Sequence, residues 1–403
     1  MNSMIRTKLS LMMFLEFFIW GAWFVTMGRY LPEALQFSDP QVATAYGTQA
    51  LGAIIAPFII GLIADRYFSA QRILGFLHLI GAILLFMAAN ASSFGSFYPL
   101  ILVYMIIYMP TLALVNSVSF HQISDPAAHF GNIRIFGTIG WIVAGLFISY
   151  ATNWENEGLL KNTFYLAAIA SAALGILSFF LPNTPPAQDR NKKSTLGDIL
   201  GFEALKLLKD NRYRLFFITS ILICIPLAFY YQMANKFLSE SGIAKPTGIM
   251  TFGQVSEALC LLLLPLFFNR FGFKKTLLLG IAAWGLRYVL FAFGNTGAGM
   301  WMLLLGIILH GICYDFFFVS GQIYTEFKAG PKVKSAAQGL ITLATYGVGM
   351  MIGFYVAGLV GKMYTLPEGG HYWKMIWLLP AGFALVVLLF FALTFKSEKV
   401  ATS

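Results

Sequence analysis

The sequence predicts an all-α membrane protein with twelve transmembrane helices in two six-helix bundles. The first observation is composition: of 403 residues, 58% are hydrophobic and only 11% are charged, whereas about 25% of a soluble chain is charged. The second is a set of twelve apolar runs, each near the roughly 20 residues that cross a bilayer. The third is one long polar stretch that divides these runs into six and six. So few charges exclude several soluble domains, a disordered chain and a nucleic-acid-binding protein.

Each apolar run is a candidate span. The spans are 9–30, 41–64, 72–91, 96–119, 131–152 and 162–181 in the first half, and 213–237, 248–269, 274–294, 298–323, 336–362 and 374–395 in the second. The first run follows Arg6 and Lys8, as in a signal peptide. It is too long for one and no cleavage motif follows it, so we expect it to be retained.

Residues 182–212 are expected to form a cytoplasmic linker between an N-terminal bundle, 1–181, and a C-terminal bundle, 213–403. Apolar residues within the linker have the spacing of an amphipathic helix on the membrane surface, namely Leu196, Ile199, Leu200, Leu205 and Leu208.

Lys and Arg near span ends predict the orientation, because cytoplasmic loops carry most of them. Nineteen of the 27 basic residues fall on the side of the N-terminus and the linker, six fall on the other side, and two lie inside spans. Both termini are therefore expected in the cytoplasm. Topology, and not a polyanionic partner, explains the net charge of +10.

The loop between the second and third spans carries a motif. Its sequence, GLIADRYFSAQR, resembles the cytoplasmic signature of the major facilitator superfamily, G-x-x-x-D-[RK]-x-x-[GS]-x-[RK]-[RK], with matches at Gly61, Asp65, Arg66, Ser69 and Arg72. The equivalent loop of the second half, NRFGFKK, keeps the basic residues but lacks the acid. We expect a gating loop, because an acid at a helix end can bind a basic residue in one conformation and release it in another. A basic loop without a gating role is the alternative.

Five charged residues fall inside spans: Glu16, Arg134, Glu257, Arg287 and Asp315. A charge at mid-membrane costs about 2.5–3.5 kcal/mol on insertion scales, so such residues are usually functional or paired. These five are therefore the first candidates for function.

On the fifth span, Arg134, Thr138 and Trp141 share one helical face, because residues four and seven apart align. A guanidinium, a hydroxyl and an indole together suit a planar, polar solute, while Gly137 and Gly140 allow close helix approach. The alternative is that Arg134 lies near enough to the cytoplasmic end to reach the interface.

On the eighth span, Gln254 and Glu257 are three residues apart and share a face. The amide can hydrogen-bond a solute, and the carboxylate can carry a proton. Pairing of Glu257 with Arg287 on the ninth span is the structural alternative.

On the tenth span, His310 and Tyr314 share a face and Asp315 lies on its flank as a second proton-carrier candidate. His310 is interpreted as a packing residue more than as a titrating group. No sequence context assigns a partner to Glu16, which is either a packed, protonated acid or a third coupling carboxylate. His78 is interpreted as a packing residue.

No catalytic motif such as G-x-S-x-G, HExxH or a P-loop is present. We therefore expect no enzyme activity, no cofactor and no metal site, and we expect the three intramembrane cysteines to be core residues. Without a nucleotide site, uphill transport needs an ion gradient, and buried carboxylates favour protons over sodium.

Together these segments resemble the nucleoside:proton symporter family of the major facilitator superfamily. The resemblance is densest in GLIADRYFSA, YMPTLALVNSVSF, IRIFGTIG, QVSEALCLLLLPLFFNRFG, AWGLRYVLFAFG, YDFFFVSG and SAAQGL. It implies two six-helix bundles that work by alternating access and take up nucleosides with protons across a bacterial inner membrane.

The resemblance also implies site residues. The residues that match the family's nucleoside site are Arg134, Thr138, Gln254, Glu257 and Asp315. In that family, the carboxylates and the amide are expected to hold the ribose hydroxyls or the base edge. The lining departs from the family pattern at four positions: Trp141 stands for a Phe, Tyr231 for an Asn, His310 for a Tyr and Tyr314 for a Phe. Glu16 stands where the family has a neutral amide.

The sequence therefore predicts a proton-coupled nucleoside importer that acts as a monomer, with membrane lipid, a nucleoside and protons as its partners. Because the lining differs, a carrier for another sugar-like or glycoside solute is the nearest alternative. A non-transporting membrane receptor on the same scaffold is the remote alternative, and the duplicated loop and mid-membrane charges argue against it.

Overall fold

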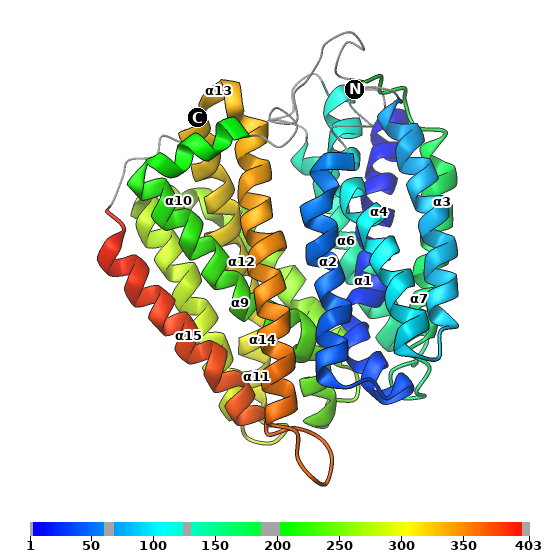
Figure 1. Ribbon diagram of the computed structural model, residues 1–403, viewed down its shortest axis with the longest axis vertical. Helices are drawn as coiled ribbons and strands as arrows, with labels where there is room; N and C mark the ends of the chain where they lie inside the picture. The colour runs from blue at the N-terminus through cyan, green and yellow to red at the C-terminus, as the bar shows by residue number, and fades with distance from the viewer. Residues whose placement is uncertain (1–2, 60–67, 124–129, 187–201, 397–403) are drawn as a thin grey trace. The chain divides into compact units, whose positions relative to one another are not determined.

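The computed structural model describes the chain except for residues 1–2, 60–67, 124–129, 187–201 and 397–403. Every regular element in the described residues is a helix, apart from a single bridge between Thr365 and His371 (Figure 1). The chain divides into two compact units. Unit 1 consists of Met1–Phe37 and Thr48–Ile199, and unit 2 of Ser38–Gly47 and Leu200–Ser403.

Unit 1 is built from long apolar helices. They are α1 (Ser3–Leu35), the second part of α2 (Asp39–Ile59), α3 (Ala70–Ala89), α4 (Phe94–Gln122), α6 (Gly131–Leu146) continued by the π-helix η2 (Phe147–Ala151), and α7 (Asn162–Ser178). A capping box starts α4: the Ser93 side chain accepts a hydrogen bond from the Ser96 N–H, and the Ser96 side chain accepts one from the Ser93 N–H. Such a box satisfies backbone donors that the first helical turn leaves open.

Unit 2 contains a short 3-10 helix, η3 (Phe202–Lys209), followed by α-helices and short π-helices. These are α9 (Asn211–Glu240), α10 (Pro246–Phe293), α11 (Met300–Ile308), α12 (His310–Tyr314), the π-helix η4 (Asp315–Val319), α13 (Ser320–Thr342), the π-helix η5 (Leu343–Gly349), α14 (Met350–Met363) and α15 (Trp373–Thr394). Two glycines with positive φ interrupt them, Gly272 (φ 74°) in α10 and Gly330 (φ 66°) in α13. Glycine adopts such angles at little cost, so each helix turns sharply there.

The predicted spans coincide with described helices. Because α10 is interrupted at Gly272, it supplies both the eighth and the ninth span, and the tenth runs from Met300 to Gly330. Among the described residues, nine helical segments are long and apolar enough to cross a membrane. The sixth span is the shorter apolar helix α7, and the second is described as far as Ile59. The prediction of an all-α protein with these spans is confirmed in the described residues.

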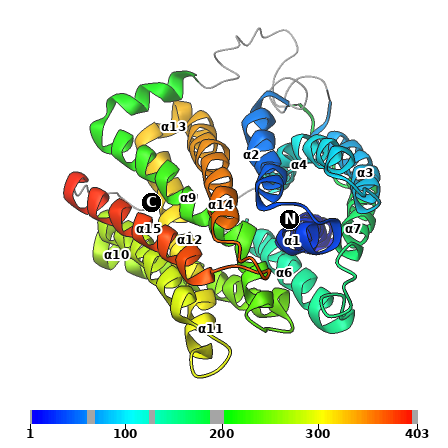
Figure 2. The same cartoon turned by 60° about the horizontal axis from the view of Figure 1, so that its bottom comes forward.

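Within unit 1, α1 packs against α6 and α7, and α3 packs against α4 and α7 (Figures 1 and 2). Gly140 brings α6 close to α1, since a Cβ atom at this position would lie only 2.1 Å from the backbone oxygen of Phe14. A Cβ atom at Gly137 would lie 2.6 Å from the Phe17 ring. The expected role of these two glycines in close helix approach is therefore confirmed.

The linker begins with two hydrogen bonds to the start of α3. The side-chain amide of Gln71 donates to Asn183 Oδ1 at 2.9 Å, and its oxygen accepts from the Thr184 N–H at 2.9 Å. Of the expected amphipathic helix, Leu196, Ile199 and Leu200 lie outside the described residues. Leu205 and Leu208 fall in η3, which is a 3-10 helix.

Four charged or titratable side chains meet in unit 2 at the ends of α2 and α9 and before α15: Asp39, Lys236, Glu240 and His371. We call them the acid–histidine cluster. His371 Nε2 lies 3.2 Å from Asp39 Oδ2, and its Nδ1 lies 3.1 Å from Glu240 Oε1. Lys236 Nζ lies 3.3 Å from Asp39 Oδ1. Because each ring nitrogen faces a carboxylate, both donate hydrogen bonds when the imidazole is cationic.

The cluster shifts the pKa of both His371 and Asp39. Burial opposes the charged imidazole, but the hydrogen bonds to Asp39 and Glu240 outweigh burial and raise the pKa of His371 above 6.5. Burial also opposes the Asp39 carboxylate, but the hydrogen bond from His371 and the charge of Lys236 lower its pKa below 3.8. Asp39 and His371 are therefore both charged between pH 3.8 and 6.5.

The cluster predicts a loss of stability on the alkaline side. A raised pKa means that His371 stabilises the fold fully below its ordinary value of 6.5 and that this contribution is lost as the pH rises through the raised value. The melting temperature of the detergent-purified protein should therefore fall by several degrees over that range. In His371→Gln this alkaline decrease should be absent. His121→Gln, at the exposed end of α4, is the matched control, and an unchanged alkaline slope in His371→Gln would contradict the assignment.

Candidate functional site

Three ionisable side chains of unit 2 come into contact between α10 and α12. His310 Nδ1 lies 3.0 Å from Arg287 Nη1, and His310 Nε2 lies 3.6 Å from Glu257 Oε2. Arg287 and His310 are buried, whereas the Glu257 side chain is 25% exposed. His310 therefore lies between the base and the acid.

The protonation of this trio follows from what a guanidinium can do. Arg287 only donates hydrogen bonds, so Nδ1 of His310 must accept. The ring proton is then on Nε2, which faces Glu257. The 3.6 Å between Nε2 and Glu257 Oε2 is too long for a direct hydrogen bond, so the two groups interact electrostatically. A neutral imidazole thus separates a cation from an anion, and the trio is balanced in charge when Glu257 is ionised. The expected pairing of Glu257 with Arg287 takes this indirect form.

Tyr230 of α9 completes the surroundings of Arg287. Its ring centre lies 3.5 Å from the guanidinium carbon and 5.3 Å from the His310 ring centre. A cation against an aromatic face is stabilised by the ring's quadrupole. Within the part of the chain that the structure describes, Arg287 Nε and Nη2 have no hydrogen-bond partner. Sequence reasoning missed Tyr230, although it adjoins the predicted Tyr231.

Gly311 explains why His310 reaches Glu257. A Cβ atom at Gly311 would lie 2.5 Å from the backbone oxygen of Ser256 and 2.7 Å from the backbone nitrogen of Glu257. Any larger residue would push α12 away from α10. The backbones therefore touch at this point, and the neighbouring side chains are held within bonding distance.

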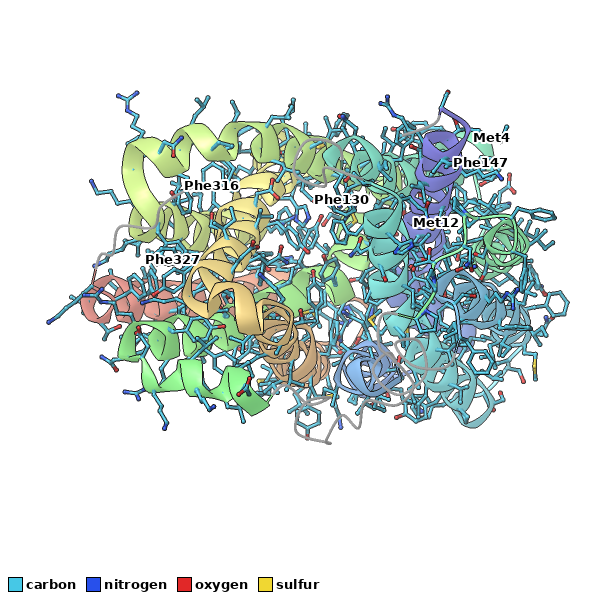
Figure 3. All side chains as sticks on the ribbon, turned by 90° about the horizontal axis from the view of Figure 1, so that it is seen from above. Met4, Met12, Phe130, Phe147, Phe316 and Phe327 are labelled. Atoms are coloured by element: carbon cyan, nitrogen blue, oxygen red, sulfur yellow. The ribbon has the colours of Figure 1, made fainter. Side chains whose placement is uncertain are left out.

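Asp315 is the first residue of the π-helix η4 and is buried. Its Oδ2 atom has no hydrogen-bond partner among the described residues, and Glu257 is close enough to interact with it electrostatically. π-helical turns are frequent at functional sites. The next residue, Phe316, which is labelled in Figure 3, packs on Phe267 with 4.9 Å between ring centres, and this contact anchors the turn that carries Asp315.

The remaining predicted residues of unit 2 lie on three helices. The hydroxyl of Tyr314 is hydrogen-bonded to that of Tyr346 in η5, and the Tyr231 ring centre lies 6.0 Å from that of Tyr230. Tyr231 and Tyr314 are half-buried, and Gln254 is 9% exposed. Tyr346 was not predicted, because a single Tyr in an apolar span has no distinctive spacing.

In unit 1, the predicted stripe on α6 faces α1. The Arg134 guanidinium lies 4.1 Å from the centre of the Phe17 ring, and the Trp141 ring centre lies 5.6 Å from that of Trp20. Thr138, between them along the helix, is half-buried. The stripe therefore combines a cation, a hydroxyl and an indole along one helix contact.

Glu16 has a partner that the sequence did not indicate. Its Oε2 atom lies 2.8 Å from Nε2 of His78, and both residues are buried. The interpretation of His78 as a packing residue is therefore wrong. The pair lies 62 residues apart in sequence and on different helices, so no local pattern connects the two residues.

The predicted gating loop lies mostly outside the described residues, which exclude Gly61, Asp65 and Arg66. Arg72 is exposed in the first turn of α3. The gating role stays a prediction. Cys224, Cys260 and Cys313 are buried and free, which confirms their interpretation as core residues.

Comparison with known proteins identifies the family of this chain. A profile of the nucleoside H+ symporter family matches residues 2–400. The chain belongs to the nucleoside H+ symporter family. It is 40% identical over 401 residues to the putative nucleoside transporter YegT of Escherichia coli strain K12, covering 97% of this chain and 94% of the relative. The family is one of membrane transporters and not of enzymes.

Two further similarities extend over nearly the whole chain. The nucleoside permease NupG of the same organism is 33% identical over 411 residues, covering 98% of this chain and 97% of NupG. The crystal structure of the nucleoside transporter NupG, in a mutant form, superposes with a TM-score of 0.90 at 32% identity, covering 97% of this chain and all of that chain. The predicted family and fold are therefore confirmed for this symporter.

Replacing His310 with Ala should destabilise the symporter, because Arg287 then loses its hydrogen-bond acceptor while it stays buried. Leaving a buried donor without its acceptor costs about 1–3 kcal/mol, and more when the donor is charged; thermal unfolding in detergent measures the loss. His310→Gln is the matched control, since its amide can accept from Arg287 and donate towards Glu257. It should keep most of the stability. If His310→Ala melts at the wild-type temperature, the ring does not stabilise the guanidinium.

Proposed function

We propose that this symporter carries nucleosides into a bacterial cell together with protons, by alternating access across the inner membrane. The observation that carries the proposal is the group of ionisable side chains inside unit 2: Arg287, His310, Glu257 and, beside them, Asp315. Ionisable residues within membrane spans typically mark solute and proton pathways. The family match over residues 2–400 supports nucleosides as the solute class.

Proton coupling is assigned to Glu257 and Asp315 as a pair. One guanidinium lies in this group, so two ionised carboxylates would leave one negative charge without compensation. An uncompensated charge is costly in an apolar interior, and one bound proton removes that cost. Because neighbouring carboxylates titrate as a unit, the proton belongs to the pair and not to one residue.

Solute binding is assigned to polar and aromatic groups in each unit. In unit 2, Gln254 and the free N–H groups of Arg287 supply hydrogen bonds to a ribose or to the base edge, and the rings of Tyr231 and Tyr314 supply apolar faces. In unit 1, Arg134, Thr138 and Trp141 supply the same two kinds of contact. A nucleoside needs both kinds, because its base is flat and apolar on its faces and polar at its edge.

The chain is proposed to work as a monomer with both termini in the cytoplasm. The excess of Lys and Arg on the side of the termini and the linker supports this orientation. A single copy suffices because one chain contains both six-span halves. The partners are then the nucleoside, protons and the surrounding lipid.

Asp315→Asn and Glu257→Gln should each abolish accumulation of nucleoside driven by a pH gradient. Each substitution keeps the shape of the side chain but removes the proton-binding acid. Uptake of labelled uridine and adenosine into proteoliposomes, against a solute gradient, measures the effect. Glu326→Gln, an exposed acid of α13, is the matched control and should accumulate like the wild type.

Two outcomes would contradict this proposal. Uphill accumulation by both acid variants would refute the coupling assignment while leaving nucleoside transport intact. Failure of the wild type to bind any nucleoside in a competition panel that includes sugars and glycosides would instead favour a different sugar-like solute.

A further inference from the structure

Among the described residues of unit 1, Glu16 and His78 form a buried pair of ionisable side chains. Glu16 of α1 is 0% exposed and His78 of α3 is 1% exposed. Glu16 Oε2 and His78 Nε2 lie 2.8 Å apart. At this distance a hydrogen must lie between the two atoms, because a carboxylate oxygen and an unprotonated ring nitrogen would repel each other.

The surrounding hydrogen bonds determine where the protons are. Ser171 of α7 donates its hydroxyl hydrogen to the backbone oxygen of His78 at 2.8 Å. Its oxygen is then left to accept from His78 Nδ1, which lies 3.1 Å away. Nδ1 therefore carries one hydrogen, and a second hydrogen is shared between His78 Nε2 and Glu16 Oε2. Whether that hydrogen lies nearer nitrogen or oxygen, the pair as a whole is neutral.

The other oxygen of Glu16 is held independently of this shared proton. The Thr111 hydroxyl of α4 lies 2.6 Å from both Glu16 Oε1 and the Tyr108 backbone oxygen, which share its single hydrogen, and the Tyr108 hydroxyl donates to the Glu16 backbone oxygen at 2.7 Å. The titratable groups that face Glu16 from α4 are the phenols of Tyr104 and Tyr108. From α6, Arg134 lies over the ring of Phe17, the residue after Glu16. These bonds hold Glu16 against α4.

We propose that Glu16 and His78 form a second proton-binding site of the symporter, which is filled and emptied once in each transport cycle. This inference rests on the proposed function. It adds a proton to the one carried by Glu257 and Asp315, whose binding stays obligatory for uphill transport. The structure shows the loaded pair. On release, the bond of the shared proton to the pair breaks, the proton leaves to water, and the pair becomes a carboxylate beside a neutral imidazole.

Proton release also changes the contact between two helices. Without the shared hydrogen, two lone pairs would face each other at 2.8 Å, so Glu16 and His78 must separate. Proton occupancy is therefore tied to the contact of α1 with α3. In a purely structural pair the proton would never leave, so the contact between Glu16 and His78 would stay the same throughout the transport cycle.

The number of protons moved per nucleoside tests the proposal. In proteoliposomes with the membrane potential held at zero, the uridine gradient that just balances an imposed pH gradient depends on that number. For a pH gradient of about one unit, the wild type should balance at about a hundredfold uridine ratio, and Glu16→Gln/His78→Gln at about tenfold. The two amides can hydrogen-bond each other but have no exchangeable acid. Exchange of internal for external uridine should persist in this variant.

Glu155→Gln is the matched control, since Glu155 is another buried acid of unit 1, hydrogen-bonded to Ser149. It should balance at the wild-type ratio. A double variant that balances like the wild type overturns the proposal. So does a wild type that balances at about tenfold, and this measurement needs no variant that folds. Failure of the wild type to accumulate uridine at all would refute the proposed function itself.

Discussion

Apolar surroundings leave a buried charge no partner except another side chain of the same bundle, and the arrangement of this protein depends on that constraint. Water can solvate an exposed carboxylate, but lipid cannot. In unit 1 the carboxylate of Glu16 is met by His78, and in unit 2 a histidine lies between Arg287 and Glu257. A histidine suits both places because it can donate at one nitrogen and either accept or donate at the other. Asp315 lacks a partner at Oδ2 among the described residues, which is why it stands out as a proton carrier.

Close backbone contact is what brings these side chains within range. Gly311 lets α12 touch α10 beside Glu257, and Gly140 lets α6 touch α1 at Phe14, two residues before Glu16. Without a strong hydrophobic drive between helices in lipid, packing of small residues is a main source of helix association. The same glycines therefore stabilise each bundle and set the geometry of its ionisable groups. The π-helix at Asp315 adds a local change of register that a regular α-helix would not allow.

The acid–histidine cluster applies the same chemistry at the ends of helices. There both ring nitrogens of His371 face carboxylates, so the charged imidazole is favoured. Between α10 and α12 of the same unit, one ring nitrogen of His310 instead faces the guanidinium of Arg287, and the neutral ring is favoured. The partner on the second nitrogen therefore decides whether each histidine carries a charge. For Glu16 and His78 that second partner is a hydroxyl, which allows either form, and this is the property that a reversible proton site needs.

Composition and periodicity by themselves determined that this chain crosses a membrane, which segments are its candidate spans and which five charges lie inside them. These features depend on single residues and their neighbours in sequence, because a helix must satisfy its own backbone and its apolar surface must meet lipid. The choice of partners was decided only by the tertiary structure. The pairing of Glu16 with His78, the position of His310 between Arg287 and Glu257, and the ring of Tyr230 against Arg287 all join separate helices. Such contacts depend on how glycines and aromatic side chains pack helix against helix, and no spacing along one helix contains that information.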